Sequence, residues 1–266
     1  MRNVVQYCTT FLLANGRKYM KEMIQKIAMD VWGVIQNWGL SLAEDFETNF
    51  ITDNRWKYIV EGLETTLLVT FLALVLGVIL GFVVAIIRAT HDKTNKLKFF
   101  NVICNLYITV IRGTPVVVQL LIIYYVIFAS VNVDKVFVAV LAFGLNSGAY
   151  VAEIVRSGIM AVDEGQFEAG RSLGFNYVQT MVHIIMPQAF KNILPALGNE
   201  FIVLLKETSV AGYVALQDLT KGGDIIRSRT YSYTPLIVTA LIYLVMVIGF
   251  SKLLNILERR LRNSER

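Results

Sequence analysis

The side chains that could do chemistry in this chain are polar residues inside otherwise apolar runs. Asn146, Ser147 and Glu153 lie within one such run, and Glu200 lies within a later one. Polar side chains are costly to bury in lipid, so a functional role is the first hypothesis for each of them. In a cavity between helices a carboxylate could bind a cationic group. Arg112, beside a predicted helix break, could bind an anionic one.

A structural role is the alternative for the same residues. Glu153 could pair with Arg156 or Arg112 and so hold helices together. Asn146 could form a hydrogen bond across a helix interface. Both interpretations stay open for Asn146 and Glu153, whereas the structural one is favoured for Arg112. Glu207 is expected near the outer surface, where a solvated gate or cap role is favoured over contact with a ligand.

Patterns of catalysis and metal binding are missing from the sequence. It contains no G-x-x-x-x-G-K-(S/T) phosphate loop and no G-x-S-x-G nucleophile turn. His91 and His183 fall in polar connections, and Cys8 and Cys104 lack the spacing of metal ligands. We therefore expect no catalytic residue, no metal site and no cofactor. Any energy source must lie in another polypeptide or in an ion gradient.

The composition is typical of a membrane protein. Of the 266 residues 55% are hydrophobic and 17% are charged, and the mean hydropathy is +0.56. The net charge of +5 is modest. In such a chain it indicates basic residues on the cytoplasmic side of a membrane and not nucleic-acid binding.

Five apolar runs predict transmembrane helices. The longer runs can cross a hydrocarbon core of about 30 Å, and the shorter ones can cross part of it. The runs are at about 66–87, 115–129, 136–155, 190–205 and 236–257. Pro115 disfavours helix at Thr114 and fits the first turn of a new helix. The sequence therefore predicts an amphipathic approach along the inner surface, a break at Arg112–Pro115, and then the second span.

Small residues recur every fourth position in the first run, at Ala73, Gly77, Gly81 and Ala85. On a helix they form a stripe where another helix backbone can approach closely. A specific dimer contact and the ordinary glycine content of a membrane helix are the two explanations left open. Residues 17–40 alternate apolar and charged positions at helical spacing. They predict an amphipathic helix on the outer membrane surface or against the bundle, inside an extracytoplasmic segment 1–60.

The distribution of Lys and Arg sets the expected orientation. With the C-terminus inside, the inner segments and the tail 261–266 hold ten basic residues near the spans and the outer segments hold six. We therefore expect the N-terminus outside, the C-terminus in the cytoplasm, and the polar segment 160–187 in the cytoplasm.

The segment 160–187 has the signals of a short capped helix. Asp163 can cap a helix that begins with Glu164, and Gly174 can end it. A short helix held between two spans can transmit a push from a soluble partner. From these signals alone a merely solvated loop would be favoured.

A spaced pattern reverses that preference. It reads Glu168-Ala169-Gly170-x3-Gly174-x9-Ile184-x-Met186-Pro187. It resembles the EAA loop of ABC importer permeases, with Gly170 in the place of the second alanine and Met186 in the place of the leucine. Three further motifs look like the polar amino acid uptake branch of those permeases: Arg112-Gly113-Thr114-Pro115-x3-Gln119, Asn146-Ser147-Gly148-Ala149-Tyr150-x-Ala152-Glu153-x2-Arg156-x-Gly158-Ile159, and Lys206-Glu207-Thr208-Ser209.

This resemblance covers about residues 55–260, with residues 1–50 outside it. It implies an all-α integral membrane protein of five transmembrane helices in the bacterial cytoplasmic membrane, with residues 61–260 as the transmembrane domain. It also implies three partners: a separate ATPase subunit, an extracytoplasmic amino acid-binding protein, and a second permease, either another copy or a homologue. The residues that match the coupling loop are Glu168, Ala169, Gly170, Gly174 and Pro187.

The rival class is a gradient-driven secondary transporter or channel, in which carboxylates within the spans would bind protons or sodium. A membrane-anchored structural subunit is a third possibility, but it leaves the spaced loop unexplained. The segment 207–234 is long for a connection in a compact bundle. It is expected to be part of the landing surface for a binding protein or a plain outer loop.

Overall fold

The computed structural model describes residues 26, 29, 32, 41 and 43–263, which form two compact units, residues 1–54 and 55–266. The first unit contains a π-helical turn at Glu47–Ile51 and a 3-10 turn at Thr52–Asn54. The amphipathic helix expected at residues 17–40 lies outside the described residues, apart from helical positions at Lys26, Met29 and Trp32. Cys8 lies outside them as well.

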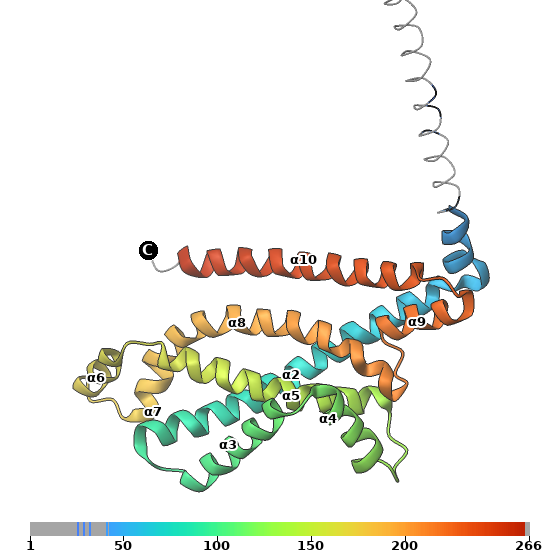
Figure 1. Ribbon diagram of the computed structural model, residues 1–266. Coiled ribbons are helices and arrows are strands. Elements are labelled where there is room, and N and C mark those ends of the chain that lie inside the picture. The colour runs from blue at the N-terminus through green and yellow to red at the C-terminus, as the bar shows by residue number, and fades with distance from the viewer. Residues whose placement is uncertain (1–25, 27–28, 30–31, 33–40, 42, 264–266) are drawn as a thin grey trace, which may run out of the picture. The chain divides into compact units, whose positions relative to one another are not determined.

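The second unit is helical (Figure 1). Its helices are α2 (Trp56–Thr94), α3 (Lys98–Gly113), α4 (Val116–Ile122), α5 (Lys135–Met160), α6 (Glu164–Ser172), α7 (Tyr177–Thr180), α8 (Met186–Glu207), α9 (Leu219–Thr230) and α10 (Thr234–Asn263). Helical turns of other types continue three of them, at Ile123–Ile127 after α4, Met181–Ile185 between α7 and α8, and Thr208–Val214 after α8.

Three of these helices, α2, α5 and α10, are long and apolar enough to cross a membrane. A fourth span results if α3 and the segment Val116–Ile127, which meet at a bend of 107°, are counted as one broken span. Helix α8 has 22 residues but is not apolar enough by the same measure, since it carries charges such as Lys191, Glu200 and Lys206. The expected count of five spans therefore stays a prediction.

The stripe of small residues on α2 is the surface on which α5 packs. Ala73, Gly77, Gly81 and Ala85 are all buried. A methyl group added at Gly77 would lie 2.9 Å from Cβ of Ser147, so the two backbones approach too closely for a larger side chain. The stripe is thus a contact between two helices of one chain, where the sequence had left open a dimer contact or ordinary glycine content.

The break between α3 and α4 lies where the proline predicts it. Thr114 is extended, with φ −125° and ψ 145°, and Pro115 precedes the first residue of α4. The last carbonyls of a helix lack partners in their own helix. Gln119 supplies one, because its Nε2 donates to the carbonyl oxygens of Ile111 at 2.7 Å and Thr114 at 3.0 Å. The buried Gln119 side chain therefore stabilises the bend.

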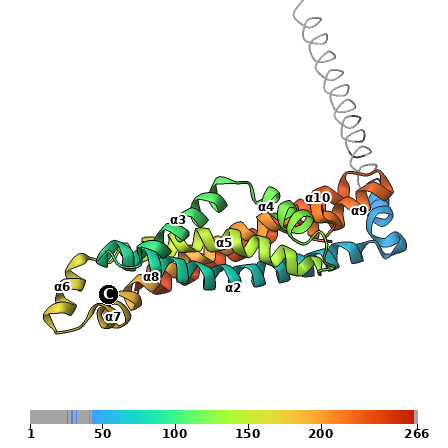
Figure 2. The same cartoon turned by 90° about the horizontal axis from the view of Figure 1, so that it is seen from below.

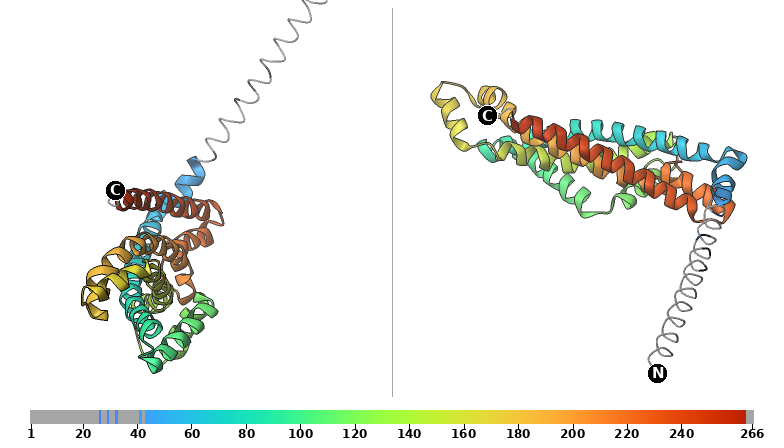
Figure 3. Two further views of the ribbon diagram at one scale, coloured as in Figure 1. Left: turned by 90° about the vertical axis from the view of Figure 1, so that its left-hand side faces the viewer. Right: turned by 90° about the horizontal axis from the view of Figure 1, so that it is seen from above.

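In this unit α5 packs between α2 and α8, and α10 packs against α8 and α9. Figures 1 and 2 show α6 and α7 together at one end of the bundle and α9 toward the other. The C-terminal end of α10 lies at the same end as α6 and α7, as the view from above in Figure 3 also shows. The segment 160–187 and the end of α10 therefore share one side of the bundle.

Candidate functional site

Helix α6 begins as its sequence predicts. Oδ1 of Asp163 accepts a hydrogen bond from the backbone N–H of Gly165 at 2.7 Å, which satisfies one of the free donors at the helix start. Glu164 occupies the first turn, where a negative charge interacts favourably with the helix dipole. The predicted N-terminal cap is confirmed.

Gly174 ends α6 in the left-handed conformation, with φ +83°. The N–H of Phe175 donates to the carbonyl of Gly170 and the N–H of Gly174 donates to that of Arg171, at 3.0 and 2.9 Å. These two bonds form the Schellman motif, in which glycine is preferred because it has no Cβ. The predicted role of Gly174 as a helix stop is confirmed.

A second capped turn follows α6 directly, and it was missed in the sequence. The Asn176 side chain accepts from the N–H of Gln179 at 3.0 Å, and the Gln179 side chain accepts from the N–H of Asn176 at 2.9 Å. The Asn-x-x-Gln spacing is a recognisable capping signal. Pro187 then stands at the start of α8. Because it has no N–H and its ring crowds the preceding turn, it accounts for the widened π-helical turn at Met181–Ile185.

Gly170 is the position at which α6 contacts this second turn. The glycine is buried, and a methyl group added to it would lie 2.6 Å from Cγ2 and 2.7 Å from Oγ1 of Thr180. Thr180 is itself 1% exposed. The branched side chain of Thr180 thus occupies the volume that an alanine methyl at position 170 would need.

Other residues of the spaced pattern are exposed, and Glu168 lies on the face of α6 that also carries Glu164 and Phe167. Glu168 and Ala169 are exposed on α6, and Pro187 is exposed at the start of α8. Among the described residues the structure gives the Glu168 carboxylate no side-chain partner within the chain. Buried Gly170 therefore fixes α6 to the protein, while Glu168 and Ala169 stay available to a partner.

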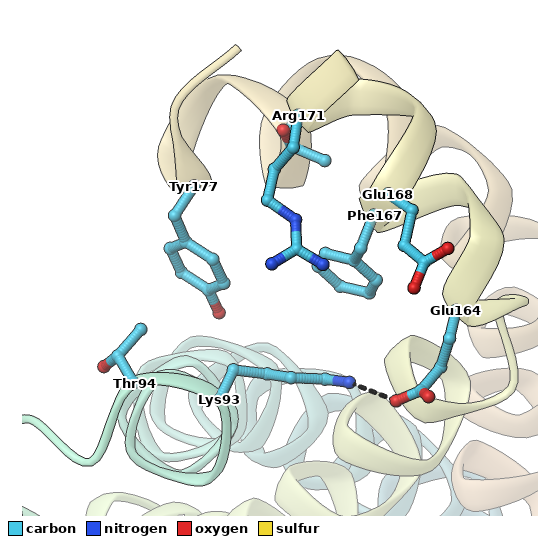
Figure 4. A pocket seen from close by; sticks show the side chains of 8 residues that line it. Lys93, Thr94, Glu164, Phe167, Glu168, Arg171 and Tyr177 are labelled. Carbon is cyan, nitrogen blue, oxygen red and sulfur yellow. Dashed lines mark hydrogen bonds and ion pairs between the residues drawn. The ribbon is translucent and has the colours of Figure 1, made fainter. Parts of the chain in front are cut away.

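The inner face of α6 borders a cavity of about 300 Å³ near the last turn of α2 (Figure 4). Nζ of Lys93 donates to Oε1 of Glu164 at 2.6 Å and lies 5.0 Å from the centre of the Phe167 ring. The hydrogen bond and the charge of Lys93 lower the pKa of Glu164 below its ordinary value. Glu168, Arg171 and Tyr177 also line the cavity, and the Glu168 carboxylate is exposed at its edge.

Ser147 and Glu200 form a buried pair between α5 and α8. The Ser147 hydroxyl donates to Oε1 of Glu200 at 2.9 Å, and the two residues are 0% and 7% exposed. Among the described residues no Lys or Arg forms an ion pair with Glu200. A buried carboxylate without a cationic partner can bind an incoming ammonium group.

Asn146 and Glu153 make the contacts expected of structural residues. Nδ2 of Asn146 donates to Oε1 of Gln119 on α4 at 3.2 Å, across a helix interface. Glu153 forms an ion pair with Arg88 of α2, and Nε of its neighbour Arg156 lies 3.8 Å from its other oxygen. The Arg156 contact was predicted. Arg88 was missed, although it is the first charge after the apolar run of α2.

A family model described as binding-protein-dependent transport system inner membrane component matches residues 73–263. The chain belongs to this family. It is therefore a membrane component of a transport system, and the comparisons give no support to a gradient-driven transporter or channel.

Two curated relatives and one solved structure resemble the permease over most of their lengths. The arginine transport system permease protein ArtQ of Bacillus subtilis (strain 168) is 38% identical, over 78% of this chain and 94% of its own. The putative glutamine transport system permease protein GlnP of Rickettsia prowazekii (strain Madrid E) is 39% identical, over 77% and 93%. A crystal structure of an amino acid ABC transporter with histidines has a TM-score of 0.72 and 46% identity, over 79% and 98%.

The remaining candidate, Arg112, lies apart from the Ser147–Glu200 pair. Its guanidinium group lies 5.2 Å from the centre of the Tyr150 ring, and the side chain is exposed. The pairing of Glu153 with Arg112 that the sequence left open is not observed. The permease places Ser147 and Glu200 together, whereas Glu153 and Arg112 each have other partners.

The segment 207–234 of the permease contains the 3-10 turn Thr208–Val214 and helix α9, and its role as a landing surface or as an outer connection stays a prediction. Asp218 caps α9 by accepting from the N–H groups of Thr220 and Lys221, both at 3.1 Å. It is 1% exposed, and burial raises its pKa to about 6. On the same helix, hydrogen bonds from Arg227 and Lys221 lower the pKa of Asp224. The half-buried Glu207 ends α8 just before this segment.

Proposed function

We propose that this permease is the membrane-spanning subunit of an ATP-driven importer for a polar amino acid, and that α6 is its coupling helix. The named relatives are amino acid permeases and cover the chain over most of its length, which supports the substrate class. The observation that carries the coupling role is the arrangement of α6. The helix is capped at both ends and held through Gly170, and it leaves Glu168 and Ala169 exposed.

The partner of α6 is a separate ATPase subunit, since the chain has no phosphate loop. Two permeases, either two copies or this chain with a homologue, form the pathway. When ATP closes the ATPase subunits on each other, they push α6 and the helices joined to it. The pathway then switches from one side of the membrane to the other by rigid-body movement.

The orientation follows from charge. The C-terminal end of α10 lies at the same end of the bundle as α6, and that end carries Arg259 and Arg260 on α10 as well as Lys93 and Arg171. Basic residues favour the cytoplasmic side. This end is therefore cytoplasmic, with the tail 261–266, and the N-terminal segment is extracytoplasmic. Helix α9 then faces outward and contributes to the surface that receives a binding protein.

The substrate contact is the Ser147–Glu200 pair. Glu200 is a buried carboxylate without a cationic partner among the described residues, and it is suited to the ammonium group of an amino acid. Its place between α5 and α8 puts it on helices that a movement of α6 would shift, because α5 and α8 flank the coupling segment in the sequence.

The test is the charge reversal Glu168→Lys in the purified complex. We expect it to remove or weaken co-purification of the ATPase subunit and to abolish ATP-dependent uptake into vesicles, because it reverses the charge of an exposed carboxylate on α6. The control is Glu64→Lys on α2, an exposed glutamate far from α6 in the sequence. If Glu168→Lys keeps both assembly and uptake, α6 is not the coupling helix. Gradient-driven uptake by the chain alone would also contradict the proposal.

A further inference from the structure

Lys93 contacts the coupling helix at two points. Its Nζ donates to Glu164 at 2.6 Å and lies 5.0 Å from the centre of the Phe167 ring. Glu164 and Phe167 are three residues apart and so lie on the same face of α6. Figure 4 shows the Lys93 side chain extending from the last turn of α2 toward this face. The amine thus connects α2 to α6 across 71 residues of sequence.

A contribution to stability does not account for the ion pair between Lys93 and Glu164. The Glu164 side chain is 82% exposed, and exposed ion pairs contribute little to stability. Phe167 differs, because it is half-buried and packs against the cluster that includes Ala85 of α2, Val155 of α5 and Ile185. The two contacts together fix the direction in which α6 lies relative to α2.

Helix α2 is itself joined firmly to α5 near this end. A methyl group at Gly81 would lie 2.5 Å from Cγ1 of Val151, so the helices are in close contact. Beyond that contact, Arg88 pairs with Glu153, and Arg156 Nη1 lies 3.4 Å from Oδ2 of Asp92. Helix α6 follows α5 after a connection of three residues, 161–163. Lys93 therefore provides a second attachment for α6, on the helix that α5 packs against.

We propose that Lys93 is a positioning residue that transmits the movement of α6 to α2, so that α2 and α5 move as one unit when the coupling helix is pushed. This rests on the proposed function of α6. Without the Lys93 amine, α6 keeps its short connection to α5, the Gly170 contact and the packing of Phe167, but it loses its hydrogen bond to α2 and can pivot against that helix. A push from the ATPase subunit is then partly lost in the pivot.

The experiment measures amino acid uptake per ATP hydrolysed, in vesicles containing the full complex. Lys93→Gln is expected to keep the ATPase subunit bound and hydrolysing ATP, while uptake per ATP falls about fivefold or more, the size of a typical coupling between sites. Lys93→Arg keeps a cation for both Glu164 and Phe167 and is expected to retain most of the wild-type value. The matched control is Lys96→Gln, an exposed lysine three residues further on, in the connection that follows α2.

Exchanging the charges of Lys93 and Glu164 tests whether the contact between them matters, and not only the presence of a lysine at position 93. Lys93→Glu is expected to lower uptake per ATP strongly, and the double variant Lys93→Glu/Glu164→Lys to recover a substantial part of it. Unchanged uptake per ATP in Lys93→Gln would overturn the inference, as would a double variant no better than Lys93→Glu. If no ATPase subunit co-purifies with the wild-type chain, the proposed function itself fails. If the complex assembles, Glu168→Lys disrupts coupling and the Lys93 variants keep the wild-type uptake per ATP, the inference on Lys93 fails while the proposed function stands.

Discussion

The Ser147 hydroxyl on α5 donates a hydrogen bond to Oε1 of Glu200 on α8 over a distance of 2.9 Å. Gly77 of α2 makes room for this pair, because an added methyl group would lie 2.9 Å from the Ser147 side chain. The hydroxyl and the carboxylate therefore meet where α2, α5 and α8 come together. This arrangement gives the first prediction.

Glu200→Gln is expected to reduce uptake about tenfold or more while the ATPase subunit still co-purifies, because the amide keeps the shape but loses the charge that binds an ammonium group. Ser147→Ala removes only the hydroxyl and is expected to have a smaller effect. Uptake rates and co-purification of both variants check this. Wild-type uptake by Glu200→Gln would remove Glu200 from the pathway.

Glu153→Ala is expected to destabilise the permease without a specific loss of transport. The change leaves Arg88 without its carboxylate, and the two side chains are only 17% and 29% exposed. Loss of a partly buried pair of this kind costs about 1–2 kcal/mol of stability. Each kcal/mol lowers the melting temperature by about 2–4 °C. Thermal unfolding of the complex measures it. The exchange Arg88→Glu/Glu153→Arg should restore stability. Lost uptake at unchanged stability would instead favour a substrate contact.

Gly170→Ala is expected to displace α6 from the turn that follows it. The new methyl group would lie 2.6 Å from Cγ2 of Thr180, and crowding of this kind costs about 1–3 kcal/mol. Thr180→Ala removes both crowding atoms, so the double variant should recover stability and uptake. A double-mutant cycle on melting temperature and uptake tests the pair. Additive effects of the two substitutions would show that the side chains do not interact.

Asp218→Asn is expected to stabilise the permease above pH 6. Burial raises the Asp218 pKa from 3.8 to about 6, so the folded state favours the neutral carboxyl. Between these two pH values the folded protein binds more protons than the unfolded one, and stability falls as pH rises. At pH 7.5 the charged form costs about 2–3 kcal/mol. Asparagine keeps the helix cap and removes this cost.

Melting temperatures at pH 4, 5, 6 and 7.5 check the Asp218 prediction. The gain from Asp218→Asn should be present at pH 7.5 and should shrink toward pH 4. The control is Asp224→Asn on the same helix, where Arg227 and Lys221 lower the carboxyl pKa and the substitution should bring no gain. A loss of stability that is equal at every pH would contradict the burial argument.

Local signals in the sequence indicated the helical membrane class and the two ends of α6, although on those signals alone a solvated loop was favoured over a coupling helix. Apolar runs, Pro115, Asp163 and Gly174 each act within a turn or two of the chain, so their effects do not depend on distant residues. The spaced pattern from Glu168 to Pro187 likewise indicated the family that the comparisons then showed.

Only the tertiary structure decided which polar side chains meet. Glu153 and Arg88 are 65 residues apart and Lys93 and Glu164 are 71 apart, and nothing local in the sequence pairs them. Their meeting depends on how closely α5 packs on the small-residue face of α2. That closeness is set by the volume of side chains on both helices at once. The sequence therefore supplied the helices and the coupling segment, and the packing of α2 on α5 determined the contacts between them.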